Sequence, residues 1–116
     1  MTKSVIVIDD DEDTVRLFSE FLEENDIQVI GQGHDGKKAV ELYQQKKPDC
    51  LLIDIMMPNG SGFYAIKKIK EIDSDAKIIA VTGDGRFTTE QKLEKLEIPV
   101  IYKPFKMQDV LDKIHN

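Results

Sequence analysis

The stretch from Cys50 to Gly62, CLLIDIMMPNGSG, constrains the fold of this chain more than any other. Its apolar run leads straight into Asp54, and Pro58 and glycine then break the pattern, which predicts a buried strand that ends abruptly. Asp54 would lie at the carboxyl end of this strand, the edge where ligands bind in open α/β sheets. A carboxylate there can act as a nucleophile or a metal ligand, although a single aspartate could also serve as a helix cap or turn residue.

The rest of the chain repeats this alternation of short apolar runs and amphipathic segments. The predicted strands are 5–8, 27–30, 50–53, 78–81 and 99–102, and the predicted helices are 12–25, 37–46, 63–72, 88–96 and 106–115. Gly31, Gly33 and Gly36 are expected to end the second strand. Thr88 and Gln91 have the spacing of a capping box for the fourth helix. The pattern indicates an α/β fold, with one doubly wound parallel sheet covered by helices on both faces and one domain spanning residues 1–116.

Composition narrows the class of partner. The formal net charge of -6 argues against nucleic-acid and anionic-membrane binding, which need a basic surface. Cys50 is the single cysteine, so an internal disulfide is excluded and a reducing compartment is favoured. We expect no signal peptide, because residues 1–4 are polar and the next apolar run is short, and no apolar span reaches the ~20 residues that a membrane helix requires. A cytoplasmic protein is therefore expected.

The chemistry is predicted at the strand ends. The first strand ends in Asp9 and Asp10, the third in Asp54, the fourth in Thr82 and the fifth in Lys103. In a parallel sheet these ends lie along one edge. Crowded carboxylates need a cation, and an all-oxygen ligand set suits Mg²⁺. The lysine and the hydroxyl could hold the oxygens of a phosphoryl group arriving at Asp54, which predicts phosphoryl transfer onto a carboxylate.

Each of these side chains also has an ordinary structural interpretation. Asp9, Asp10 and the neighbouring Asp11 could cap a helix. Thr82 could be a simple strand-end hydroxyl and Lys103 a solvated surface lysine. It is the combination of complementary groups at all four strand ends that favours a functional site.

Five motifs together resemble the receiver domains of two-component response regulators, over essentially the whole chain. The motifs are VIVIDDDED, HDGKKAVEL, LLIDIMMPNGSG, AVTGDG and IYKPF. The resemblance implies a flavodoxin-like strand order of 2-1-3-4-5 and a stand-alone, chemotaxis-regulator-like protein. Such a protein is not a conventional enzyme, because it catalyses only its own phosphorylation and dephosphorylation.

The same resemblance implies a role for each matching residue. Asp54 would be the phosphoacceptor, with Thr82 and Lys103 contacting the phosphoryl group. Mg²⁺ would be bound directly by Asp10, Asp54 and the backbone carbonyl of Met56, and by Asp9 through water. A cis peptide bond is implied between Lys103 and Pro104, which is the permissive kind of linkage.

Two departures from the family concern switching. The aromatic residue that usually stands three positions before the lysine is replaced by Val100, and Tyr102 is the nearest aromatic. The usual Gly-Ala before the fifth strand is replaced by residues 96–99 (LEIP). We therefore expect Thr82 to move, with the aromatic rotation either absent or carried out differently. Met56 and Asp84 stand where the family tunes attack by water, and the apolar Met56 predicts slow self-hydrolysis.

The expected partners are proteins. The resemblance implies a histidine kinase or phosphotransfer protein as donor, and a target that binds the face from Thr88 to His115. We expect no output domain after the last helix, since the sequence has no helix-turn-helix pattern or basic patch. His34 and His115 are expected to have surface or capping roles.

Three alternatives remain at this stage. Gly31, Gly33 and Gly36 form a G-x-G-x-x-G pattern after a strand, as in dinucleotide-binding folds, although Asp35 would repel a pyrophosphate. A Ca²⁺ loop at residues 9–20 lacks the glycine at its sixth position, where Thr14 stands. The chain could also be a degenerate receiver that acts only as a docking module.

Overall fold

The computed structural model describes residues 2–58, 61–83 and 85–116. Strands and helices alternate along the chain, as the sequence pattern predicts. The strands are β1 (Ser4–Ile8), β2 (Gln28–Gly33), β3 (Cys50–Asp54), β4 (Ile78–Thr82) and β5 (Val100–Tyr102). The helices are α1 (Glu12–Glu24), α2 (Gly36–Lys46), α3 (Ser61–Ile72), α4 (Phe87–Lys95) and α5 (Met107–His115).

The strands form one parallel sheet in the order β2-β1-β3-β4-β5. This order and the alternating helices confirm the predicted flavodoxin-like fold. β3 lies in the middle of the sheet and is buried along its whole length, which explains its continuous apolar run. Because the strands are parallel, their carboxyl ends all lie along one edge.

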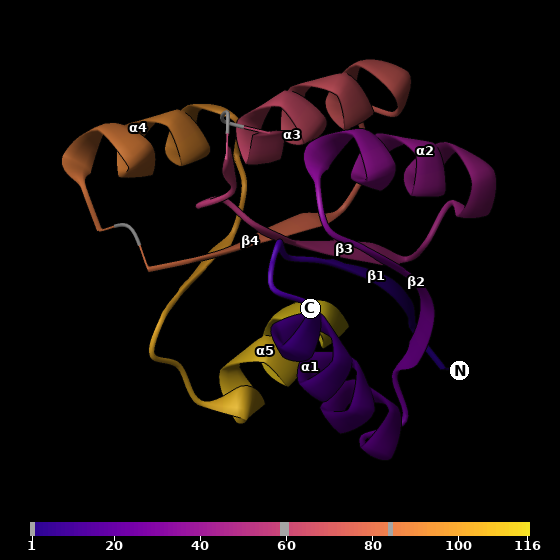
Figure 1. The fold of residues 1–116 in the computed structure, drawn as a ribbon. Helices are drawn as coiled ribbons and strands as arrows, with labels where there is room; N and C mark the ends of the chain where they lie inside the picture. Colours follow the sequence, from indigo (N-terminus) through magenta and orange to yellow (C-terminus); the bar gives the residue numbers. More distant parts are fainter. Residues whose placement is uncertain (1, 59–60, 84) are drawn as a thin grey trace.

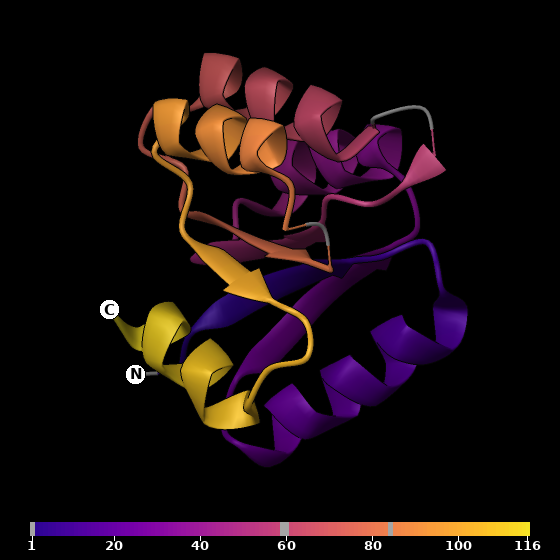
Figure 2. The same ribbon diagram turned by 90° about the vertical axis from the view of Figure 1, so that its left-hand side faces the viewer.

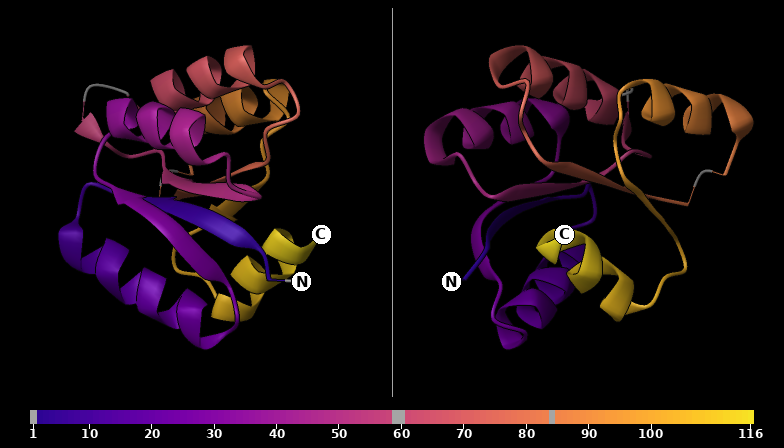
Figure 3. Two further views of the ribbon diagram at one scale, coloured as in Figure 1. Left: turned by 90° about the vertical axis from the view of Figure 1, so that its right-hand side faces the viewer. Right: turned by 180° about the vertical axis from the view of Figure 1, so that it is seen from behind.

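Helices cover both faces of the sheet. Figures 1 and 2 show α2, α3 and α4 on one face and α1 and α5 on the other. The view from behind in Figure 3 shows α5 lying beside α1. Successive residues of a strand point to opposite faces, so Ile6 and Ile8 contribute to the first core cluster while Val5 and Val7 contribute to the second. None of the helices in the described part of the chain is long and apolar enough to cross a membrane.

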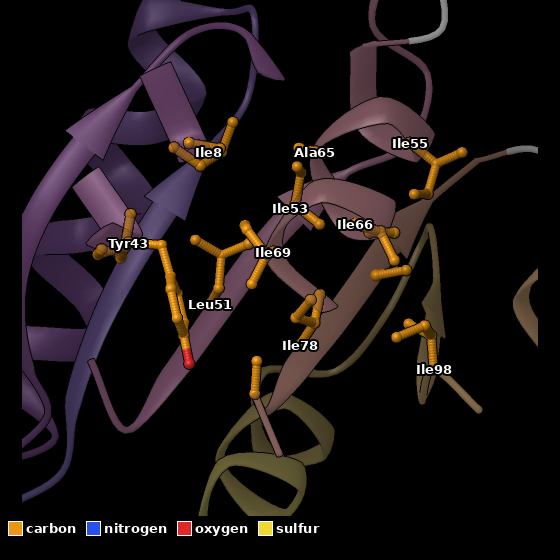
Figure 4. Close-up of a cluster of buried hydrophobic side chains, with 14 of the residues drawn as sticks. Ile8, Tyr43, Leu51, Ile53, Ile55, Ala65, Ile66, Ile69, Ile78 and Ile98 are labelled. Atoms are coloured by element: carbon orange, nitrogen blue, oxygen red, sulfur yellow. The ribbon is translucent and has the colours of Figure 1, made fainter. Parts of the chain in front are cut away.

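The larger apolar cluster lies between the sheet and helices α2, α3 and α4. In Figure 4, Leu51, Ile53 and Ile78 of the strands face Ile66 and Ile69 of α3. All five side chains are fully or almost fully buried. This packing holds α3 against the sheet next to β3, the strand that ends at Asp54.

The second strand is longer than predicted. It continues through Gly31 and Gly33, where the sequence predicted a break, and its pairing with β1 shifts by one residue after Val5. A Cβ atom at Gly31 would lie 3.3 Å from Ile6 Cγ1 and 3.4 Å from Leu42 Cδ2. Glycine is therefore used here for close packing inside a strand. The first two glycines of the G-x-G-x-x-G pattern lie in the strand, not in a turn before a helix.

The predicted capping box of the fourth helix is wrong. Helix α4 begins at Phe87, with Arg86 at the N-cap position and no side-chain hydrogen bond to the cap. Thr88 is already inside the helix. A cis peptide bond between Lys103 and Pro104 is present, as the family resemblance implied.

Candidate functional site

Three acidic side chains meet at the carboxyl edge of the sheet. β1 and β3 are neighbours with Ile8 paired to Ile53, so Asp9 and Asp54, the residues that follow this pair, are brought side by side. One carboxylate oxygen from each of Asp9, Asp10 and Asp54 lies within 4.8 Å of the other two. Asp9 and Asp54 are buried, with exposed fractions of 7% and 5%, while Asp10 is exposed.

Backbone amides hold the two buried carboxylates in place. The Met56 N–H donates to Asp54 Oδ1 at 2.9 Å, and the Asp11 N–H donates to Asp9 Oδ1 at 3.0 Å. Each bond therefore uses one oxygen of its carboxylate. The other oxygens, Asp54 Oδ2 and Asp9 Oδ2, point toward the same cation, the side chain of Lys103.

Lys103 supplies the positive charge of the site. Its Nζ lies 3.6 Å from Asp9 Oδ2 and 3.6 Å from Asp54 Oδ2. Its backbone N–H donates to the Thr82 carbonyl at 2.8 Å, which ties the ends of β4 and β5 together. Thr82 is completely buried. The structure thus brings the five strand-end residues of the sequence prediction to one edge of the sheet.

The acidic cluster fits a hard divalent cation. The cluster contains three carboxylates, and one ammonium group lies beside two of them, so the set carries an excess of negative charge when all are ionised. Oxygen ligands of this kind are those that Mg²⁺ prefers. Asp9, Asp10 and Asp54 are the side chains that could hold the ion. Met56 lies beside them, since its N–H binds Asp54.

The sequence did not single out two polar contacts at this edge. His34 Nδ1–H donates to the Asp9 carbonyl at 3.0 Å, so this exposed histidine supports the backbone of the acidic cluster. Its position just after β2, at the same edge, was the signal that could have identified it. The Thr14 hydroxyl donates to the Asp11 carboxylate, and this bond is the main cause that lowers the pKa of Asp11.

A small hollow of about 40 Å³ lies beneath the site. Its walls include Thr14, Phe18, Val81, Lys103 and Phe105, and the two phenylalanine rings are 5.9 Å apart at their centroids. The aliphatic stem of Lys103 therefore runs past an apolar wall built from α1 and the loop after β5.

The residues expected to govern switching lie in different surroundings. Val100 is half-buried and packs against the larger core cluster, whereas Tyr102 is 39% exposed at the end of the edge strand β5. The side chain of Met56 is 55% exposed. Asp84 lies outside the described residues.

Comparison with known proteins gives a consistent result. The family described as response regulator receiver domain matches residues 5–115. The chemotaxis protein CheY of Halobacterium salinarum is 36% identical over 117 positions, which cover 100% of this chain and 97% of that protein. The chemotaxis protein CheY of Bacillus subtilis is 30% identical, with coverage of 100% and 98%.

Solved structures share the fold. The response regulator domain of Thermotoga maritima CheB has a TM-score of 0.84 at 27% identity, covering 99% of this chain and 95% of that one. The CheX-CheY-BeF3-Mg complex of Borrelia burgdorferi contains a chain with a TM-score of 0.88 at 24% identity, with coverage of 97% and 86%. A CheY-like receiver domain protein of Methanospirillum hungatei has a TM-score of 0.90 at 22% identity, with coverage of 99% and 92%.

Proposed function

This chain belongs to the family of response regulator receiver domains, and we propose that Asp54 is its phosphoacceptor in a Mg²⁺-dependent reaction. The donor is a histidine kinase or a phosphotransfer protein, and the phosphorylated chain signals by altered contacts with a target protein. The observation that carries the proposal is the position of Asp54, which shares an acidic cluster with Asp9 and Asp10 and faces Lys103 Nζ at 3.6 Å.

The proposed step is an in-line phosphoryl transfer. A carboxylate oxygen of Asp54 attacks phosphorus, and the P–N bond of the donor phosphohistidine breaks as the new O–P bond forms. The histidine nitrogen leaves with the electron pair of the broken bond. Bound Mg²⁺ would offset the charge of the acidic cluster and of the phosphoryl oxygens.

The protein contributes orientation and charge to this step. The Met56 N–H holds Asp54 Oδ1, which fixes the rotation of the carboxylate before the donor arrives. The Lys103 ammonium is placed to bind phosphoryl oxygens, and the bond from its backbone to Thr82 positions it. The Thr82 hydroxyl is the second group proposed to contact the phosphoryl oxygens.

The target is proposed to bind the face formed by α4, β5 and α5, from Thr88 to His115. Tyr102 lies on the exposed edge of β5 in this face. Phosphorylation adds negative charge beside Lys103 and shifts the balance between surface conformations. Thr82 moves in this change, and because Val100 stands at the position of the usual aromatic residue, the aromatic rotation is either absent or carried out differently. Since Cys50 is a buried free thiol, the proposal places the protein in the cytoplasm.

Intact-mass analysis tests the proposal. The protein is incubated with acetyl phosphate and Mg²⁺, alongside an Asp54→Asn variant and a metal-free sample. We expect one phosphate adduct in the complete reaction and none in either control. An adduct that persists in Asp54→Asn would contradict the assignment of the phosphoacceptor.

A folded protein that gains no adduct calls for a second measurement, the binding of beryllofluoride with Mg²⁺. Binding would show that the site is competent and that the small donor is the obstacle. Absence of binding as well would favour a docking module that works without phosphorylation.

A further inference from the structure

A groove of about 650 Å³ lies between α4 and the segment that joins β3 to α3. Figure 2 shows α3 and α4 side by side on the same face of the sheet. We call it the α3–α4 groove. The side chains that line it include Met56, Pro58, Phe63, Arg86, Thr88 and Lys92, and Asp10 of the acidic cluster lines it as well.

On the side formed by α4 and Phe63, the walls of the α3–α4 groove combine apolar surface with positive charge, whereas Asp10 adds a carboxylate at the end next to the acidic cluster. Met56 is 55% exposed and Phe63 is partly exposed. Lys92 Nζ lies 5.2 Å from the centroid of the Phe63 ring, a cation–π contact that holds the ammonium group over the groove. Lys92 forms no salt bridge with any other described residue, so its charge is available to an anionic ligand. Arg86 adds a second cationic side chain to the wall.

The cationic side chains on the wall of the α3–α4 groove contrast with the formal net charge of -6 of the whole chain. A nucleic acid would meet repulsion over most of the surface, and two cationic side chains with an apolar floor offer little to a phosphate backbone. A short peptide with apolar side chains next to Asp or Glu matches both properties of the wall. Its apolar side chains would contact Met56 and Phe63, and its carboxylates would pair with Lys92.

We propose that the α3–α4 groove is a docking site for a short acidic segment of a partner protein that carries apolar anchor residues. The site goes beyond the proposed phosphorylation: it shares Thr88 and Lys92 of α4 with the proposed target face but extends away from β5 and α5 toward Met56 and Phe63. It touches the phosphorylation site at one end, because Met56 lines the groove and its N–H binds Asp54 Oδ1. Peptide and phosphoryl group would therefore share a residue, so we expect the affinity for the peptide to differ between the unmodified and the phosphorylated protein, and by thermodynamic linkage such a coupling is reciprocal.

Fluorescence anisotropy with labelled peptides tests the groove. The probe is a peptide with a Leu-Phe pair flanked by Asp and Glu. One comparison peptide has Lys in place of each acid, and another has Ser in place of Leu and Phe. We expect only the probe to bind. Absence of binding up to about 1 mM, or equal binding of the basic peptide, would overturn the proposal.

Two charge-reversal variants on the same helix make the test specific. Lys92→Glu should weaken binding of the probe by about tenfold or more, the equivalent of one lost charge contact of about 1.4 kcal/mol. Lys95→Glu makes the same change in charge but lies outside the groove, beside Gln91 and Glu94, and should leave the affinity within about twofold. Equal weakening in both variants would mean non-specific attraction and would overturn the docking site.

The groove can be tested separately from the phosphorylation chemistry. Both variants should still gain one phosphate at Asp54, so loss of peptide binding with intact phosphorylation isolates the groove. Sedimentation of the unmodified protein and of Lys92→Glu identifies a competing occupant. Self-association that Lys92→Glu abolishes would assign the groove to a second copy of this chain and would overturn the peptide proposal.

Discussion

Met56 is a residue whose backbone and side chain have different tasks. Its N–H fixes the Asp54 carboxylate at 2.9 Å, and any residue except proline can provide that bond. Its side chain is 55% exposed next to Asp54, the proposed phosphoacceptor, and an apolar side chain there offers an attacking water no hydrogen bond. The lifetime of the phosphorylated state should therefore depend on the side chain at this position.

Met56→Asn should shorten that lifetime. A hydrogen bond that orients water is worth about 0.5–1.5 kcal/mol, so the hydrolysis rate should rise by up to about tenfold. Decay of the phosphate adduct, followed by intact mass after removal of the donor, measures the rate. Met56→Leu keeps both the backbone bond and an apolar side chain and should decay like the unmodified protein. Equal rates for Met56→Asn and Met56→Leu would refute the interpretation.

Ser19 places a polar hydroxyl group in the apolar interior. It lies on the buried side of α1 with an exposed fraction of 4%, and its Oγ has no hydrogen-bond partner among the described residues. A buried polar atom without a partner is destabilising, and serine also favours a helix less than alanine does.

Ser19→Ala should raise the free energy of unfolding by about 1 kcal/mol. Urea denaturation followed by circular dichroism measures the change. Ser74→Ala, at an exposed position between α3 and β4, is the control and should change little. A loss of stability in Ser19→Ala would show that the hydroxyl does make a stabilising contact in solution.

At the scale of elements, α1 and α4 end in the same way. Asp26 and Glu97 follow the two helices with φ values of 64° and 56°, the left-handed conformation that favours glycine. In each case the next residue donates back five positions, Ile27 to the Leu22 carbonyl and Ile98 to the Leu93 carbonyl, as in the Schellman motif. The departure from the family before β5 is thus accommodated by an acidic residue at a glycine position.

Asp26→Gly and Glu97→Gly should each stabilise the protein by about 0.5–1 kcal/mol. Glycine removes the left-handed strain and a negative charge at a helix C-terminus, and part of the gain is offset by the entropy of the unfolded chain. Glu94→Gly makes the same change within α4 and should destabilise by about 1 kcal/mol. Thermal unfolding distinguishes these signs, and a loss of stability in Glu97→Gly would contradict the explanation.

At the scale of the whole molecule, two buried side chains, the thiol of Cys50 and the phenol of Tyr43, resist ionisation. Burial raises the pKa of the Cys50 thiol to about 12, from 9.0. Burial, together with the hydrogen bond to Asp73, raises the pKa of the Tyr43 hydroxyl to about 12, from 10.0. Both groups lose their protons earlier in the unfolded chain than in the folded one. Their contribution to stability is complete below pH 9 and is lost as the pH rises toward 12.

The free energy of unfolding should therefore fall between pH 9 and 12, with Cys50 contributing a slope of about -1.4 kcal/mol per pH unit. Urea denaturation at several pH values measures the slope. Cys50→Ala will be less stable at every pH because of the cavity it creates, but its slope should be shallower by that amount. An unchanged slope would show that the thiol is not responsible.

Much of this molecule was determined by local sequence. The apolar runs and the breaks after them identify the strands, and the rule that parallel strands share a carboxyl edge predicts that Asp9, Asp54 and Lys103 lie together. These inferences succeed because periodicity and turn residues act over a few positions. The cis bond before Pro104 was predictable through the family resemblance.

Tertiary structure alone decided what depends on contacts between distant segments. Gly31 lies inside a strand, at a position where Ile6 and Leu42 leave little room for a side chain, although locally it resembles a break. His34 supports Asp9 from another strand end, and Lys92 lies over Phe63 from another helix. No local pattern encodes these pairs, because the distance between two side chains is fixed by how the helices pack on the sheet.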